Sequence, residues 1–297
     1  MKTNSRQNMN TIKAKRNKSQ FSLVWIRFRK NKLSMLGLII LTVLLLLALF
    51  APLYIPYSNV ASQSIANAFQ PPSWSHLFGT DQYGRDLFAR IIYGGRISLF
   101  AGLVTMGIAF VCGIAMGGAA GFFGGRVDTV VMRFCDVLMS VPGILLSMSI
   151  VAALGQGLFK MLIALSVSQI PRQARTVRAS VMTLRDQEFI EAARSCGTGN
   201  ARIILKHIIP NVLGPLIVGV MMGLGGTILQ IASLGFLGIG IAPPTPEWGT
   251  IISENQASLM YYPHLGIIPG VFIMISVLSL NFIGDGLRDA LDPKMKN

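Results

Sequence analysis

Length, composition and charge place this chain in a membrane. Of its 297 residues, 52% are hydrophobic and only 13% are charged, with a net charge of +14. Globular chains average about 25% charged residues, and a chain this apolar does not stay disordered. The basic charge would suit a nucleic-acid binder, but such proteins lack uncharged runs as long as residues 33–80. We therefore expect an all-α integral membrane protein with no nucleic-acid partner.

The chain begins with a basic segment, residues 1–32, that holds ten Lys and Arg and no acid. We interpret it as a cytoplasmic segment that fixes the topology and attracts anionic lipid; a dedicated partner site is the alternative. The apolar run after it predicts a first transmembrane helix over residues 33–53. No Ala-x-Ala-like cleavage site follows, so we expect a retained anchor rather than a signal peptide, and then an external loop over residues 54–96.

A transmembrane core is expected over residues 97–284. A helix needs about 20 apolar residues to cross the hydrocarbon layer. Runs of this kind predict further spans at 97–121, 137–154, 158–172, 212–234 and 265–284. The span 158–172 is the weakest, because it is short and contains Lys160 and Gln169. The prediction is six spans, with five as the fallback, and a cytoplasmic tail over residues 285–297.

The distribution of basic residues predicts the orientation. With six spans, one side of the membrane receives the segments 1–32, 122–136, 172–211 and 285–297, which hold 22 Lys and Arg. The other side receives only four, namely Arg85, Arg90, Arg96 and Lys160. Because Lys and Arg accumulate in cytoplasmic loops, we expect both termini in the cytoplasm.

Several kinds of chemistry are disfavoured. Proton-coupled transporters keep ionisable groups inside their spans, whereas every predicted span except 158–172 is free of formal charge. The protease motifs His-Glu-x-x-His and Gly-x-Ser-x-Gly are absent. Three cysteines without a Cys-x-x-Cys pair exclude a cysteine-rich zinc module, and the three histidines are far apart in sequence. We expect no catalytic residue and no metal ligand.

Glycine is concentrated in two predicted spans. Gly113, Gly117, Gly121 and Gly125 recur every four residues, and Gly219 and Gly223 repeat the spacing. Small residues at this spacing let another helix approach closely, so we predict tight packing; a hinge or sliding surface is the alternative.

The segment 172–211 is the largest feature between two spans. Four arginines at near-helical spacing and an apolar stripe predict a helix that Gly197 and Gly199 break. A second helix is predicted over residues 201–209, ended by Pro210. Forty residues are more than a simple connector needs, so we expect this segment to dock on another protein.

The same segment carries a resemblance to a known family. Glu191-Ala192-Ala193, then Gly197, then His207-Ile208-Ile209-Pro210 is similar to the EAA loop of ABC-importer membrane subunits. Three further blocks resemble the second permease subunit of the dipeptide, oligopeptide and nickel importers. These blocks are residues 78–86, residues 233–249 and residues 281–289. The resemblance extends from about residue 20 to residue 293.

The resemblance implies the type I ABC importer permease fold and a multi-pass position in a bacterial cell membrane. It also implies three kinds of partner: a homologous second permease that completes a heterodimer, two cytoplasmic ATP-binding subunits, and an extracellular or periplasmic substrate-binding protein. The chain has no Gly-x₄-Gly-Lys-[Ser/Thr] motif to hold ATP phosphates. We therefore expect no cofactor on this chain, no enzymatic activity of its own, and ATP and Mg on the partners.

Three groups of candidate site residues follow. The expected ATPase-coupling residues are Glu188, Glu191, Ala192, Ala193, Gly197 and Pro210. In this group Glu191 is expected to make a hydrogen bond or ion pair, and Gly197 to adopt a left-handed turn. The expected contacts with the binding protein are Asp81, Arg85, Asp86, Pro244, Glu247 and Trp248, for which turn geometry and local ion pairing are the alternative. The expected pathway-lining residues are Gln230, Ser233 and Asn281, selected for polarity alone.

Short peptides are the predicted substrate, from the resemblance and from charge-free spans that suit a wide, weakly selective path. Nickel or a metal chelate remains open as the substrate within the same family. A channel or scaffold subunit without transport is the alternative of a different class.

Overall fold

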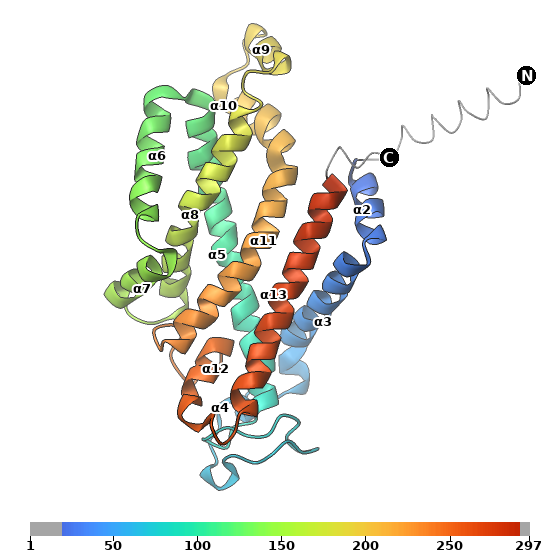
Figure 1. Cartoon of the computed structure of the whole chain (residues 1–297), viewed down its shortest axis with the longest axis vertical. Helices are drawn as coiled ribbons and strands as arrows, with labels where there is room; N and C mark the ends of the chain where they lie inside the picture. Colours follow the sequence, from blue (N-terminus) through green and yellow to red (C-terminus); the bar gives the residue numbers. More distant parts are fainter. Residues whose placement is uncertain (1–19, 292–297) are drawn as a thin grey trace, which may run out of the picture.

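The computed structural model describes residues 20–291, and these residues fold into a bundle of helices (Figure 1). Within this range there is no strand, only an isolated bridge between Thr80 and Asp86. The expected all-α fold is therefore confirmed. The basic residues before position 20 and the end of the expected tail, residues 292–297, lie outside the described residues.

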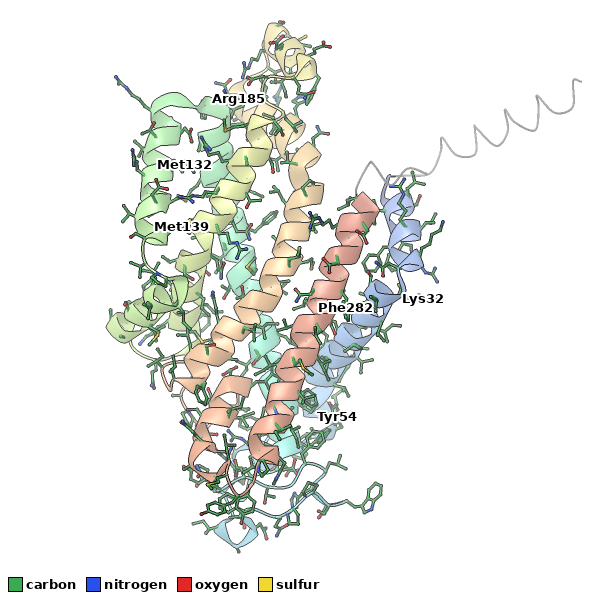
Figure 2. The ribbon with its side chains drawn as sticks, in the orientation of Figure 1. Lys32, Tyr54, Met132, Met139, Arg185 and Phe282 are labelled. Atoms are coloured by element: carbon green, nitrogen blue, oxygen red, sulfur yellow. The ribbon has the colours of Figure 1, made fainter. Side chains whose placement is uncertain are left out.

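Five long helices build the bundle: α3 (Lys32–Tyr54), α5 (Leu87–Phe123), α8 (Leu158–Met182), α11 (Ile209–Phe236) and α13 (His264–Leu291). Figure 2 marks Lys32 and Tyr54 at the two ends of α3. Shorter helices connect or flank them: α2 (Gln20–Lys30), α6 (Gly125–Met139), α7 (Gly143–Leu154), α9 (Glu188–Ser195) and α12 (Trp248–Glu254). The smallest elements are α4 (Ser58–Ala61), η1 (Ile65–Asn67), α10 (Asn200–Arg202), the π-helical η2 (Ile203–Ile208) and η3 (Gln256–Ser258).

The predicted count of six membrane-crossing helices is not reproduced. Among the described residues, four helical segments are long and apolar enough to cross a membrane: Lys32–Tyr54, Leu87–Phe123, Asn200–Phe236 and His264–Leu291. A fifth appears only if α6 and α7, which are bent by 84° at their junction, form one broken span. The helix α8 does not qualify, because Lys160 and three arginines interrupt its apolar run. The count therefore matches the fallback of five at most.

Three predicted boundaries were wrong, for local reasons. The span 137–154 is split between α6 and α7, because Pro142 has no backbone N–H and disfavours a helical residue before it. The helix α5 starts at Leu87 rather than 97, where Asp86 accepts a hydrogen bond from the Ala89 amide at 2.7 Å. Pro210 does not end a helix: it lies in the first turn of α11, where the missing N–H is not needed.

The glycine repeat in α5 packs against α8, as expected. A Cβ atom added to Gly117 would lie 2.2 Å from the carbonyl oxygen of Ala174, and one added to Gly113 would lie 2.6 Å from the Cβ of Gln173. Gly121 meets α8 in the same way. Gly125 departs from the repeat, because it begins α6 and faces open space. This close packing holds α8 inside the bundle, although α8 carries Lys160 and three arginines.

The two ends of the bundle differ in structure. The start of α2, the end of α13 and the short helix α9 lie at one end, while α4 and α12 lie at the other (Figure 1). The first end is here called the α9 end, and the second, with residues 55–86 and 237–263, the loop end. Between the two ends, Gly37 of α3 packs against α13, and its added Cβ would lie 2.9 Å from the Cβ of Phe282 (Figure 2).

Candidate coupling and docking surfaces

The short helix α9 stands at the tip of the bundle and packs on it through Ile190, Ala193 and Arg194. Ile190 is fully buried and belongs to a cluster with Val177 and Val181 of α8 and with Ile203 and Ile208 of η2. This cluster fixes the position of α9 on the ends of two long helices. The helix α9 therefore packs on α8 and on η2, which continues into α11.

The C-terminus of α9 has the backbone conformation that the sequence predicts. Gly197 has φ +76°, the left-handed region that favours glycine. Its amide donates to the Arg194 carbonyl at 2.9 Å, and the Thr198 amide donates to the Ala193 carbonyl at 3.1 Å. These bonds satisfy carbonyls that the end of a helix leaves unpaired. The turn sets the direction in which the chain leaves α9 for η2.

The outer face of α9 combines acidic and apolar side chains. Glu188, Phe189, Glu191 and Ala192 are exposed, and Ala193 is half-buried against the Ile190 cluster. The Glu191 backbone amide donates to the Gln187 carbonyl at 3.2 Å, but no hydrogen bond or ion pair joins its carboxylate to another described residue. Its expected bond is therefore not made within this part of the chain, and the carboxylate is free for another protein.

A buried cluster of four charged side chains lies at the loop end. The Nε atom of Arg85 donates to Asp81 at 2.6 Å, and its Nη2 atom donates to Glu254 at 2.9 Å. Arg90 also pairs with Glu254 and lies 3.6 Å from Asp81. The side chains are 9% exposed or less. The cluster therefore joins the loop before α5 to the end of α12, which is separated from it by more than 160 positions in sequence.

Four of the six residues expected to contact a binding protein are buried, so this part of the prediction was wrong. Asp81, Arg85, Glu247 and Trp248 are buried inside the chain, so their side chains are not available to another protein in this conformation. Local ion pairing, the alternative interpretation, holds for Asp81 and Arg85. Asp86 is half-buried; it caps α5 and pairs with His76 Nδ1 at 2.8 Å. Only Pro244 is exposed.

Glu247 and Trp248 anchor α12 to α5. The Glu247 carboxylate accepts hydrogen bonds from the Ser98 hydroxyl at 3.0 Å and from the Thr250 amide at 2.9 Å. The Trp248 indole donates to the Ile91 carbonyl at 2.9 Å. Both residues therefore position α12, and neither side chain is exposed to another protein.

The stability of the protein is expected to depend on pH through Glu247. Burial raises the pKa of this carboxyl above its ordinary range. Because the folded pKa is the higher one, its contribution is fully present below the unfolded pKa of about 4.3 and is lost as pH rises through the folded value. Glu247→Gln mimics the neutral acid, so its thermal stability should fall less between acid and neutral pH than that of wild type. Glu247→Ala should cost about 1–3 kcal/mol at acid pH, because the donors lose their acceptor, and this cost should shrink as pH rises through the folded pKa.

These stability curves would be measured on the purified complex. Parallel curves for the wild type and the Gln variant would show that the carboxyl does not titrate in this range.

The three expected pathway residues do not converge. Gln230 of α11 accepts a hydrogen bond at 2.9 Å from Gln169 of α8. Ser233 donates to the Leu229 carbonyl of its own helix. Asn281 of α13 instead faces Gly225, which lies about 140° around α11 from Gln230 at 3.6 residues per turn. The pair of glutamines forms a polar contact between α8 and α11, and Gln169 was noted only as a weakness of its span.

Exposed apolar side chains at the loop end were not anticipated. Trp74 is 98% exposed, Met260 88% and Tyr261 78%. Large aromatic side chains of this kind dominate protein–protein contacts. The sequence signal was available, since a tryptophan between serines in a polar loop has no helix to pack against. No group of three His, Cys, Asp or Glu residues that could hold a metal occurs in residues 20–291.

Two protein-family models match this chain. Residues 109–297 match the model of the inner membrane component of binding-protein-dependent transport systems, and residues 19–72 match the N-terminal transmembrane domain of oligopeptide transport permease C. The chain therefore belongs to the family of membrane permease components of binding-protein-dependent ABC importers.

Relatives match along nearly the whole chain. The dipeptide transport system permease protein DppC of Alkalihalophilus pseudofirmus is 46% identical, over 91% of this chain and 89% of the relative. The glutathione transport system permease protein GsiD of Escherichia coli is 40% identical, over 92% and 90%. The oligopeptide transport system permease protein OppC of Bacillus subtilis is 39% identical, over 95% and 92%.

A solved structure shares the fold. The chain is similar to an inward-facing structure of the MetNI methionine ABC transporter, with a TM-score of 0.57 and 21% identity. The match covers 68% of this chain and 97% of the chain in that structure. At this identity the likeness shows the fold alone, and the fold is that of a type I ABC importer permease.

Proposed function

We propose that this chain is one of two permease subunits that form the translocation path for short peptides. The observation that carries the proposal is the match over about nine-tenths of the chain to permeases named for dipeptides, oligopeptides and glutathione. The small number of charged residues in the candidate spans supports it, because a weakly selective path needs no charged side chain to bind its substrate. Gln169 and Gln230 provide neutral polar groups for peptide bonds on that path.

We further propose that α9 seats in a groove on a cytoplasmic ATP-binding subunit. Its exposed acidic and apolar face and its rigid attachment through Ile190 support this role. The two ATP-binding subunits bind ATP and Mg, and this chain binds no cofactor and catalyses no reaction. A homologous permease completes the heterodimer.

At the opposite end, the loops receive a substrate-binding protein. Trp74, Tyr261 and Pro244 are exposed there and supply the contact surface, while the charged cluster beneath them keeps the loops in place.

The α9 end then faces the cytoplasm, as the basic residues of the segment 172–211 favour. Cys196, exposed beside α9, tests this orientation in a Cys112→Ser, Cys135→Ser background. A membrane-impermeant thiol reagent should label it only in inverted vesicles. Ser73→Cys, placed at the loop end in a further Cys196→Ser variant, should label in intact cells. Labelling of Cys196 in intact cells would contradict the orientation.

The substrate is tested by growth. An amino-acid auxotroph that lacks this gene should fail to grow when di- to hexapeptides are the source of the required amino acid. Restoring the gene should rescue growth. Normal growth on peptides, together with loss of nickel-dependent urease or hydrogenase activity, would assign the path to nickel instead.

A further inference from the structure

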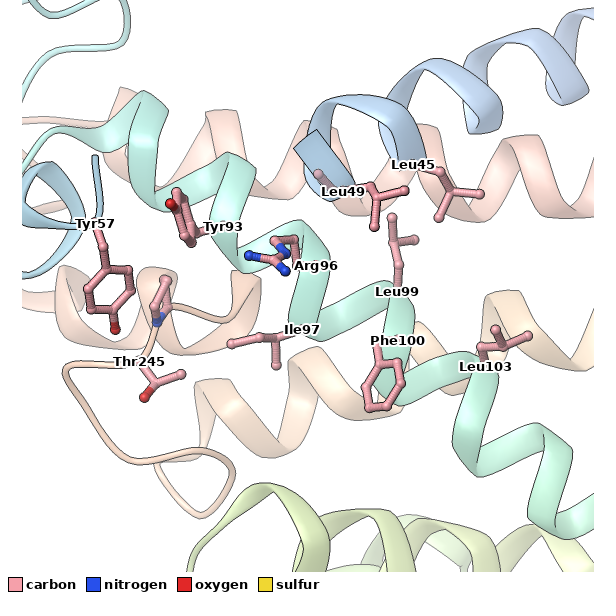
Figure 3. A pocket seen from close by; sticks show the side chains of 12 residues that line it. Leu45, Leu49, Tyr57, Tyr93, Arg96, Ile97, Leu99, Phe100, Leu103 and Thr245 are labelled. Atoms are coloured by element: carbon pink, nitrogen blue, oxygen red, sulfur yellow. The ribbon is translucent and has the colours of Figure 1, made fainter. Parts of the chain in front are cut away.

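A cavity of about 580 Å³ lies between α3 and α5 at the level of the loop that precedes α12. Figure 3 shows that its polar and apolar side chains are separated. Tyr57, Tyr93 and Thr245 line one end, and Leu45, Leu49, Phe100 and Leu103 line the other, with Arg96 between them. A groove with a polar end and an apolar end fits an amphiphile.

Among the described residues, Arg96 is the only charged side chain that lines this cavity. It is exposed, and its guanidinium lies 5.8 Å from the centroid of the Tyr93 ring. No carboxylate of the described residues pairs with it. The hydroxyls of Tyr57 and Thr245 also have no hydrogen-bond partner in this part of the chain. An anion would stabilise a positive charge at the border of an apolar surface in the membrane.

The size of the cavity suits a lipid. Taking roughly 30 Å³ for each small group, 580 Å³ holds on the order of 20 such groups, comparable with one acyl chain and part of a headgroup. Arg96 at the polar end favours a headgroup with a negative charge.

We propose that this groove binds one anionic phospholipid of the membrane. Arg96 binds the phosphate through paired N–H donors, which suit its planar guanidinium, and the hydroxyls of Tyr57 and Thr245 complete the headgroup contacts. An acyl chain lies along Leu45, Leu49, Phe100 and Leu103. Phosphatidylcholine would fit less well, because its positively charged ammonium group would lie near Arg96. No carboxylate of the described residues lines the cavity to balance these two positive charges.

Native mass spectrometry of the intact importer complex tests the proposal. After incubation with phosphatidylglycerol or phosphatidylcholine, the wild-type complex should retain phosphatidylglycerol preferentially. Arg96→Gln should reduce this retention about tenfold, which is the effect expected when one charge-assisted hydrogen bond is lost. Arg126→Gln removes an exposed arginine from the other end of the bundle and should have no effect. Leu103→Trp should fill the apolar end and release both lipids, whereas Val111→Trp, on the same helix outside the groove, should not.

A second measurement identifies the occupant directly. With p-benzoylphenylalanine in place of Phe100, irradiation should attach a phospholipid to this chain. Attachment to the partner permease would overturn the proposal, because the groove would then be part of the subunit interface. Equal lipid retention by wild type, Arg96→Gln and Leu103→Trp would also overturn it. If Arg96→Gln fails to assemble, Leu103→Trp and the crosslink decide.

Discussion

Replacing Gly197 by valine is expected to abolish transport while the protein still inserts in the membrane. Gly197 has φ +76°, where a β-branched side chain costs roughly 1–2 kcal/mol. The added Cβ would meet no neighbouring atom, so the variant changes the backbone turn and not the packing. Because the turn orients α9 relative to η2, we expect lost uptake and weaker co-purification of the ATP-binding subunits.

Gly199→Val is the matched control for this prediction. Gly199 is two residues away and also faces open space, but its φ of −65° suits any residue. It should retain transport. If Gly197→Val, combined with Glu191→Ala, leaves both uptake and co-purification unchanged, α9 is not the coupling element.

Replacing Glu254 by glutamine is expected to destabilise the loop end strongly. Arg85 and Arg90 would then share the single carboxylate of Asp81, and both guanidinium groups are buried. Breaking a buried ion pair by removing one partner costs about 3–5 kcal/mol. The variant complex should unfold at a lower temperature and accumulate poorly in the membrane.

Asp186→Asn provides the comparison for an exposed ion pair. Asp186 pairs with Arg185 at 3.1 Å with 71% of its side chain exposed, and exposed pairs contribute little. Its unfolding temperature should stay close to that of wild type. Similar losses in the two variants would show that the buried cluster does not hold the loops together.

Part of the fold could be predicted from sequence because its signals are local. The apolar run after residue 32 predicted α3 within one residue at each end. The start of α5 was missed because Arg90 is accommodated by Glu254, a partner 164 positions away. The bend between α6 and α7 carries a local signal in Pro142, but hydrophobicity alone suggested one continuous span.

Prediction of the candidate sites was limited in the same way, because contacts between residues distant in sequence leave no local signal. Gly197 was predictable because a left-handed turn at a helix end favours glycine in any protein. The burial of Glu247 and Trp248 was not predictable, because their partners, Ser98 and Ile91, lie about 150 residues earlier in the chain. A polar motif in a loop therefore looked like a surface, whereas the structure uses it to anchor α12.

We propose that this chain forms part of a peptide path and couples it to ATP hydrolysis through α9. The most direct test reconstitutes the chain with its partner permease and ATP-binding subunits in proteoliposomes. Adding a peptide-loaded binding protein from the loop side should stimulate ATP hydrolysis and uptake of labelled peptide. Gly197→Val should remove both responses, and Gly199→Val should keep them. Stimulated hydrolysis and uptake that are the same with Gly197→Val, or no peptide uptake by the wild-type complex, would contradict the account.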